Sequence, residues 1–132
     1  MASINFDNAL GIHPKALQLR AARAEVLANN LANADTPNFK ARDMNFQAML
    51  AAHMPKEQSL SMERTHRGHL QGQVSVQDEL LYRNPYQPSV DGNTVDSQLE
   101  QSIFARNAMS YNASFEFLNG KLSGLKGAIR GE

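Results

Sequence analysis

The chain has 132 residues, which is enough for one compact domain or for an elongated body with little core of its own. Tryptophan is absent and there are only six phenylalanines and three tyrosines, so large core-filling side chains are scarce and the elongated body is favoured. Basic and acidic residues number 13 each, a balance that argues against nucleic acid as a partner. The absence of cysteine excludes disulfides, thiol nucleophiles and thiolate metal sites.

The sequence shows neither a membrane span nor a cleaved signal. No apolar run approaches the roughly 20 residues that cross a bilayer. The N-terminal residues Met-Ala-Ser-Ile-Asn-Phe-Asp-Asn also lack the basic region and apolar block of a secretory signal peptide. We therefore expect that, if the protein leaves the cytoplasm, its export route reads an uncleaved N-terminus.

Residues 4–34 are predicted to form a long helix that is apolar in two directions. Leu19 and Val26 lie nearly opposite the main apolar seam, so the helix needs two neighbours. Pro14 either occupies the first turn or kinks a helix that begins near Asp7, and the kink is favoured. Thr36, which precedes Pro37, should end the helix near residues 33–35. The seam consists of Leu10, Leu17, Ala24 and Leu31, with Ala21, Leu27 and Ala28 on the same side.

Three asparagines, Asn29, Asn30 and Asn33, crowd the end of this helix although asparagine is a poor helix former. One interpretation is that they cap a fraying helix end, where asparagine is tolerated. The other is that their amides bond across a packed helix contact and fix its register, as a buried asparagine does in a coiled coil. The second interpretation is favoured because apolar residues stand between the asparagines.

The middle of the chain is predicted to be mostly extended. Asp43 looks like the N-cap of a short helix over residues 44–52 that buries Phe46, Met49 and Leu50 and ends before Pro55. Residues 56–92 are polar and interrupted by glycine and proline, which excludes a long helix. A short strand at Val74 and Val76 and an extended piece at residues 80–82 are the expected β elements.

A second long helix is predicted after the tight turn Asp91-Gly92-Asn93. Asn93 or Thr94 caps it, with Asp96 in the acidic first turn. Glycines near its end weaken the last turns by up to about 1 kcal/mol each, and they let another helix approach closely. Its apolar residues alternate spacings of four and three as a heptad seam: Phe104, Ala108, Tyr111, Phe115, Leu118, Leu122, Leu125 and Ile129.

The predicted fold is therefore mainly α. The long terminal helices, at 1–35 and 93–132, pair as an antiparallel coiled coil. Residues 36–92 connect them through a loop, a short helix and an extended segment with at most short β elements.

The sequence offers little support for a metal-binding or catalytic site. His66 and His69 lie near Glu63, but no third strong ligand follows from spacing, so solvated loop histidines are favoured over a metal site. His13 and His53 border helix ends and are interpreted as surface or capping groups. Charged residues of the first helix, among them Arg23, are interpreted as a solvated face, and Glu100 as a partner of the helix dipole. No hydrolase elbow, phosphate loop or dinucleotide fingerprint occurs, so neither an enzyme nor a cofactor is predicted.

Three stretches resemble the flagellar basal-body rod protein family of bacteria: residues 27–43, 81–89 and 91–96, with residues 53–78 unmatched in detail. The short length points to the proximal members of that family. The resemblance implies a structural subunit that is exported through the flagellar type III apparatus without signal cleavage and polymerises in the periplasm as a helical tube. This rod links the membrane ring to the distal rod and transmits torque. The implied partners are copies of the chain, other rod subunits, the membrane (MS) ring with its rod adaptor and the export apparatus.

The expected function is thus assembly, with a helical binding module such as an adaptor or an export chaperone as the alternative. The loop of residues 35–42 is expected to anchor against adjacent subunits. The predicted assembly interface comprises Asn29, Asn30, Leu31, Asn33, Asp35, Thr36, Pro37, Phe39, Asp91, Gly92, Asn93, Phe104, Tyr111, Phe115, Leu118, Leu122 and Leu125.

Overall fold

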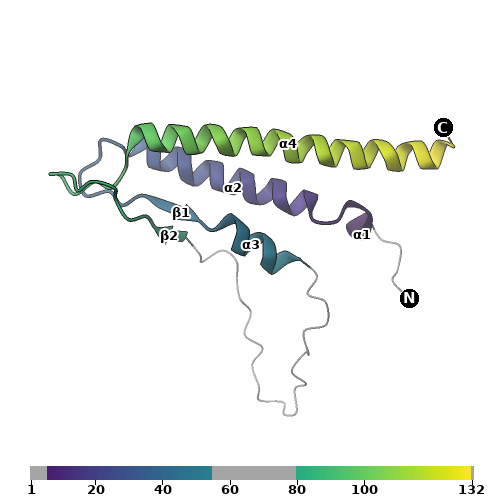
Figure 1. Ribbon diagram of the computed structural model, residues 1–132, viewed down its shortest axis with the longest axis horizontal. Coiled ribbons are helices and arrows are strands. Elements are labelled where there is room, and N and C mark those ends of the chain that lie inside the picture. The colour runs from purple at the N-terminus through teal and green to yellow at the C-terminus, as the bar shows by residue number, and fades with distance from the viewer. Residues whose placement is uncertain (1–5, 55–79, 132) are drawn as a thin grey trace, which may run out of the picture.

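Two long antiparallel helices lie side by side in the computed structural model, which describes residues 6–54 and 80–131 (Figure 1). A short helix and a two-stranded ribbon form a further layer on the N-terminal long helix. The order of elements is α1 (Phe6–Leu10), α2 (His13–Ala32), β1 (Arg42–Met44), α3 (Phe46–His53), β2 (Leu80–Tyr82) and α4 (Ser97–Arg130). The mainly helical fold with paired terminal helices is as predicted. None of the helices in the described ranges is long and apolar enough to cross a membrane.

The N-terminal helical region is broken, not kinked. Gly11 adopts a φ of 62°, in the left-handed region, and separates α1 from α2. Pro14 then lies in the first turn of α2, where its missing N–H costs little. The favoured kink at Pro14 was therefore wrong. The end of α2, with Asn33 at the C-cap, agrees with the prediction.

Two predicted N-caps were wrong by two or three residues. Asn45, not Asp43, caps α3 by accepting a hydrogen bond from the Ala48 N–H at 3.1 Å. Asp96, not Asn93 or Thr94, caps α4 by accepting from the backbone N–H groups of the second and third helical residues. In each case the residue favoured from the sequence uses its side chain in long-range contacts.

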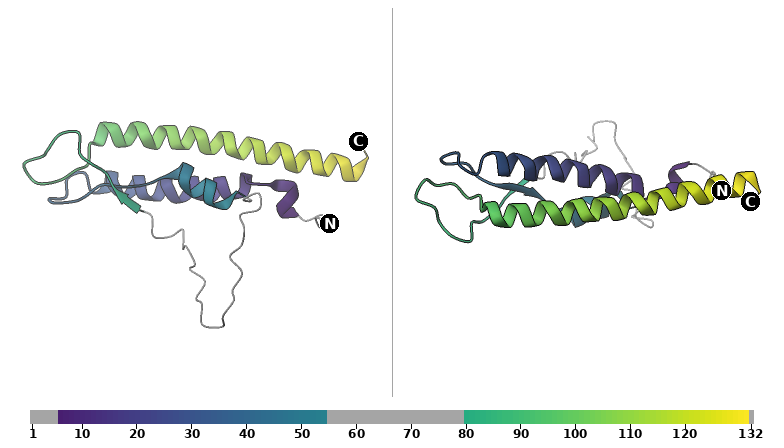
Figure 2. Two further views of the ribbon diagram at one scale, coloured as in Figure 1. Left: turned by 60° about the horizontal axis from the view of Figure 1, so that its bottom comes forward. Right: turned by 90° about the horizontal axis from the view of Figure 1, so that it is seen from above.

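The helix α2 has the two neighbours that its pattern predicts. Figure 2 shows α4 running alongside α2, and Figure 1 places the ribbon and α3 on the other side. Leu19 of α2 is buried with Met44 and Met49, and Val26 packs against the same cluster. Phe46 and Leu50 of α3 also join it, as expected. The small apolar core therefore lies between α2 and α3.

The ribbon consists of β1 and β2 in antiparallel register, with Arg42 opposite Tyr82 and Met44 opposite Leu80. This pairing confirms the extended piece at residues 80–82. Val74, Val76, His66 and His69 lie outside the described residues.

The contact line between α2 and α4 differs from the predicted apolar seam. On α4 it buries Glu100, Asn107 and Ser114, which are seven residues apart. The Asn107 side chain donates to the Arg20 carbonyl oxygen at 2.9 Å, and the Arg20 Nε donates to the Ser114 hydroxyl at 3.1 Å. Polar side chains thus lie at the contact where the coiled-coil pattern predicted apolar ones. On α2, Leu27 of the predicted seam is fully buried, but Ala21 and Ala28 are exposed.

Candidate assembly site

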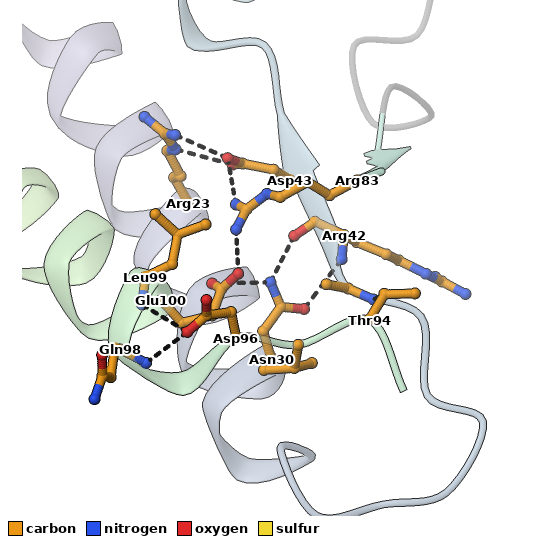
Figure 3. A network of polar contacts seen from close by, with 12 residues as sticks. Arg23, Asn30, Arg42, Asp43, Arg83, Thr94, Asp96, Gln98, Leu99 and Glu100 are labelled. Atoms are coloured by element: carbon orange, nitrogen blue, oxygen red, sulfur yellow. Dashed lines mark hydrogen bonds and ion pairs between the residues drawn. The ribbon is translucent and has the colours of Figure 1, made fainter. Parts of the chain in front are cut away.

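Buried and partly buried polar side chains, most of them drawn in Figure 3, join four segments of the chain where α2 ends and α4 begins. Because they come from α2, β1, the segment after β2 and α4, they decide how these elements sit relative to one another. We call this set the junction. It consists of Arg23, Asn30, Asp43, Arg83, Asn93 and Glu100.

Asn30 connects α2 to both β1 and α4. It is 1 % exposed, and its amide nitrogen donates to the Arg42 carbonyl oxygen at 2.7 Å while its amide oxygen accepts from the Arg42 N–H at 3.1 Å. The amide therefore occupies the backbone groups of Arg42 that β2 does not use, much as a neighbouring strand would. It also donates to Glu100 Oε2 at 3.3 Å. One asparagine thus fixes the register of three elements.

Four charged residues form a continuous chain of ion pairs beside Asn30. Arg23 donates to both carboxylate oxygens of Asp43 at 2.9 Å, a bidentate arrangement. Arg83 donates to Asp43 at 2.7 Å and to Glu100 with its other terminal nitrogen. Two arginines and two carboxylates therefore alternate along this chain of contacts.

The two carboxylates respond differently to this environment. Burial raises the pKa of Glu100, which is 1 % exposed, and this outweighs the opposing effects of Asn30 and Arg83. Burial also acts to raise the pKa of Asp43, but hydrogen bonds and charge from Arg23, with further bonds from the Met44 N–H and Arg83, lower it overall. Asp43 is therefore stabilised as the charged form and Glu100 is not.

Asn93 closes the C-terminus of α2. It is 5 % exposed, and its amide nitrogen lies 3.0 Å from the carbonyl oxygen of Asn33, 2.7 Å from that of Ala34 and 2.9 Å from that of Thr36. Carbonyl groups at a helix end lack partners within the helix, so a buried donor there satisfies them. Its amide oxygen accepts from the Val95 N–H at 2.8 Å, which also orders the approach to α4.

The loops after α2 and before α4 are held together by backbone hydrogen bonds. The Asn38 N–H donates to the Asp91 carbonyl at 2.9 Å, and the Thr94 N–H donates to the Phe39 carbonyl at 3.0 Å. Gly92 has a φ of 74°, and a Cβ at this position would lie 2.5 Å from the Asn38 side-chain oxygen. The residue stretches 27–43 and 91–96, which are distant in sequence, therefore form one structural unit.

The two interpretations of the asparagines each hold in part. Asn33 donates to the Asn29 carbonyl at 2.8 Å and accepts from the Thr36 hydroxyl at 3.2 Å, so these residues cap the helix end. Only Asn30 is buried and fixes register. Within the chain its partners are the backbone of Arg42 and the carboxylate of Glu100, and contacts of these amides with other subunits stay a prediction.

The other predicted residues near the junction are at or close to the surface. Asp35, Thr36 and Pro37 are exposed, while Leu31 and Phe39 are partly buried. Asp91 is exposed, and hydrogen bonds from the Ser89 hydroxyl and the Asn93 N–H lower the pKa of its carboxyl.

The predicted heptad seam of α4 forms an apolar surface, which we call the α4 stripe. It begins beside an open groove between α2 and α4 whose walls include Ala21, Ala24 and Ala108. Exposure reaches 52 % for Phe115 and 83 % for Ile129. Five of the seven side chains of this surface are exposed, whereas Leu118 and Leu125 are partly buried. Exposed apolar side chains along such a length of helix are typical of a surface that binds another protein. The stripe consists of Phe104, Tyr111, Phe115, Leu118, Leu122, Leu125 and Ile129.

Four junction residues were missed from the sequence: Arg23, Asp43, Arg83 and Glu100. Arg23 was taken as solvated, Asp43 as a helix cap and Glu100 as a partner of the helix dipole. A usable signal existed on α4, because the polar residues at 100, 107 and 114 repeat every seven residues like a seam. The partners of Asp43 are 20 and 40 residues away, so no local pattern marks them.

Within the described ranges, no group of three or more histidine, cysteine, aspartate or glutamate side chains could hold a metal ion. His13 and His53 lie at helix ends as predicted. The His53 ring nitrogen is 2.8 Å from the Met49 carbonyl oxygen. The ring centroids of His13 and Phe117 are 6.1 Å apart.

An elongated helical pair, closed by a polar junction at one end and bearing an exposed apolar stripe, defines a class of protein built to bind other subunits. Residues 10–40 match the family described as "Flagella basal body rod protein". The chain is 50% identical over 133 residues to the flagellar basal body rod protein FlgB of Aeromonas hydrophila, covering 98% of both chains. It is 41% identical over 130 residues to the protein of the same name from Escherichia coli K12, covering 94% of each. The chain belongs to the flagellar basal body rod protein family.

Proposed function

We propose that the chain is a structural subunit of the proximal flagellar rod, where it polymerises with related subunits into a helical tube. The observation that carries this proposal is the exposed α4 stripe on a chain of the rod family. An isolated subunit leaves Phe115, Leu122 and Ile129 in water, at 52 %, 47 % and 83 % exposure. Covering them with neighbouring helices would recover about 25 cal/mol per Å² of apolar surface.

The junction and the stripe have different tasks in this proposal. Asn30, Gly92 and Asn93 position the helices and the connecting loops within the subunit. The stripe and the exposed residues of the loop at 35–42 contact neighbours. A contact between two different surfaces, repeated with a rotation and a rise, builds an open helical assembly instead of a closed dimer.

The subunit would link the membrane ring to the distal rod and transmit torque. Its partners would be other rod subunits and copies of itself, and at the base the membrane (MS) ring and its rod adaptor. It would reach the periplasm through the flagellar type III export apparatus without cleavage of its N-terminus. A rigid junction suits this task because torque passes between subunits only if each keeps its shape.

An adaptor or export chaperone is not favoured, because relatives that match over nearly the full length are rod proteins. The family is one of structural subunits, so no reaction is proposed.

The decisive experiment is deletion of the gene, followed by a motility assay and electron microscopy of isolated basal bodies. We expect non-motile cells whose basal bodies lack the rod. Motility and the rod should both return when the gene is supplied on a plasmid. Cells that swim with complete basal bodies after the deletion would contradict the proposal. The rescue strain serves as the control for effects on neighbouring genes.

A further inference from the structure

The two ends of the elongated molecule have opposite surface chemistry. One end is formed by the loops at 33–41 and 83–96, and the other by α1 and the last turns of α4 (Figures 1 and 2). The loop end carries Asp35, Asp91 and Asp96, with Lys40 as the opposing exposed charge; Arg83 is partly buried and is paired within the junction. The other end has the opposite balance: residues 117–131 contain Lys121, Lys126 and Arg130, against Asp7 in α1 and Glu132, which follows in the sequence.

The loop end also presents apolar side chains on a stiff segment. Residues 84–90, which we call the proline loop, expose Tyr86 at 85 % and Val90 at 110 %. Pro85 and Pro88 restrict the backbone of this loop.

Both ends of the proline loop are held in place. Arg83 precedes it and is fixed by Asp43 and Glu100. Asp91 follows it and is bonded through its carbonyl oxygen to the Asn38 N–H. An exposed tyrosine on a loop that is already ordered loses little entropy on binding, and tyrosine is enriched among the residues that dominate protein interfaces.

From this arrangement we propose that the proline loop and its flanking carboxylates form a docking surface for the basic C-terminal helix end of an adjoining rod subunit. The partner is a helix end of the chemistry that this chain carries at its own far end, with lysine or arginine beside exposed aliphatic side chains such as Leu122 and Ile129. Tyr86 and Val90 bind the aliphatic side chains, and Asp35 and Asp91 face the basic ones. The proposal rests on the proposed function, because it assigns the axial contact between successive subunits of a rod.

Charge complementarity between the acidic loop end and a basic helix end favours a basic partner. Opposite potentials at two docking ends speed encounter and select against a reversed orientation, because two acidic loop ends would repel each other. The contact is heterologous, since the loop end and the helix end are different surfaces, and therefore gives subunits one polarity along the rod.

The first test is photo-cross-linking in swimming cells. Tyr86 is replaced by the photoreactive residue p-benzoylphenylalanine, and the cross-linked peptide from purified basal bodies is identified by mass spectrometry. We expect a peptide from the terminal turns of a rod subunit's C-terminal helix that contains lysine or arginine. The same replacement at Gln47, which is exposed on α3, is the control and should not give that peptide.

A cross-link from position 86 to the middle of a helix, to a protein outside the rod, or to nothing in cells that swim would overturn the docking proposal. In each of these cases the swimming cells leave the rod function itself intact. If deletion of the gene leaves swimming unaffected, the rod function fails as well, so the two failures are distinguishable.

The second test changes charge without touching the helix cap at Asp96. The pair Asp35→Asn with Asp91→Asn keeps an oxygen acceptor for the bonds to Asp91, whereas Asp35→Lys with Asp91→Lys reverses the charge. We expect the cross-link yield to fall in that order, with about a tenfold or greater loss on reversal, since like charges across an interface are strongly unfavourable.

Glu25→Lys, an exposed change on α2, shifts the net charge by the same amount as the neutral pair and is the control for charge added elsewhere on the subunit. Circular dichroism checks that each charge variant is folded. Equal cross-link yields in the folded neutral and reversed variants would overturn the assigned role of charge. An equal fall in cross-link yield in Glu25→Lys would also overturn that role, because the effect would then not depend on the loop end.

Discussion

The junction and the α4 stripe differ both in the chemistry of their side chains and in what those side chains contact. In the junction, polar and charged side chains are buried or partly buried and paired within the chain, and Asn30 and Glu100 are each 1 % exposed. In the stripe, apolar side chains lie at the surface, and Ile129 is 83 % exposed. Polar groups in the junction therefore hold the elements of the single subunit in position, and exposed apolar groups provide its capacity to assemble. Changes in the two regions should separate folding from assembly.

The largest loss of stability is expected from Asp43→Ala. This change leaves Arg23 and Arg83 without their shared carboxylate in a partly buried site, which typically costs about 3 kcal/mol. Urea denaturation followed by circular dichroism measures the free energy of unfolding. Asp35→Ala, at an exposed position, is the matched control and should stay within about 0.5 kcal/mol of the parent.

A loss of about 2 kcal/mol is expected from Asn93→Ala, because carbonyl groups at the end of α2 lose their buried donor. Asn119→Ala, at an exposed position of α4, is the control. Equal unfolding free energies for the two variants would show that Asn93 does not hold the end of α2.

The pH dependence should have opposite signs at the two carboxylates. The pKa of Asp43 is lowered in the folded state, so its stabilisation is present above its unfolded pKa and is lost as the pH falls through the folded value. Asp43→Asn should therefore cost more at pH 7 than in acid. The pKa of Glu100 is raised, so its contribution is complete below the unfolded pKa and declines as the pH rises through the folded value. Glu100→Gln should cost less at pH 7 than near pH 4.

Urea titrations of these two variants and the parent at several pH values test this contrast. If both variants shift in the same direction between acid and neutral pH, the assignment of different charge preferences to the two carboxylates is wrong.

A smaller loss, about 1–2 kcal/mol, is expected from Gly92→Ala. The left-handed φ of 74° is strained for alanine, and its Cβ would press on the Asn38 side chain at 2.5 Å. Gly124→Ala is the control, because nothing within 4 Å opposes a Cβ there. Alanine favours helix, so this variant should unfold at the same or a higher urea concentration than the parent.

The sequence predicted the helices and the faces on which they have neighbours better than the individual contacts. Opposite apolar faces on α2 correctly indicated two neighbours, since Leu19 and Val26 pack toward α3. The proline after Thr36 correctly indicated the end of α2. These signals are local, because helix periodicity and proline geometry depend on neighbouring residues alone.

The contact line between the long helices was missed because heptad reasoning assumes that apolar residues face inward. In this chain most residues of the α4 stripe are exposed, and Asn107 and Ser114 contact Arg20 of α2. Asp43 was assigned to a cap for a similar reason. Its arginine partners come from α2 and from the segment after β2, which no local pattern brings together.

The most direct test of the separation between folding and assembly is the double variant Phe115→Gln with Leu122→Gln. Both positions are about half exposed, and glutamine is a good helix former. We predict that the purified variant has an unfolding free energy within about 0.5 kcal/mol of the parent. Introduced into the deletion strain, the same variant should fail to restore motility and rods. A variant that unfolds much more easily, or one that restores swimming fully, would contradict the account.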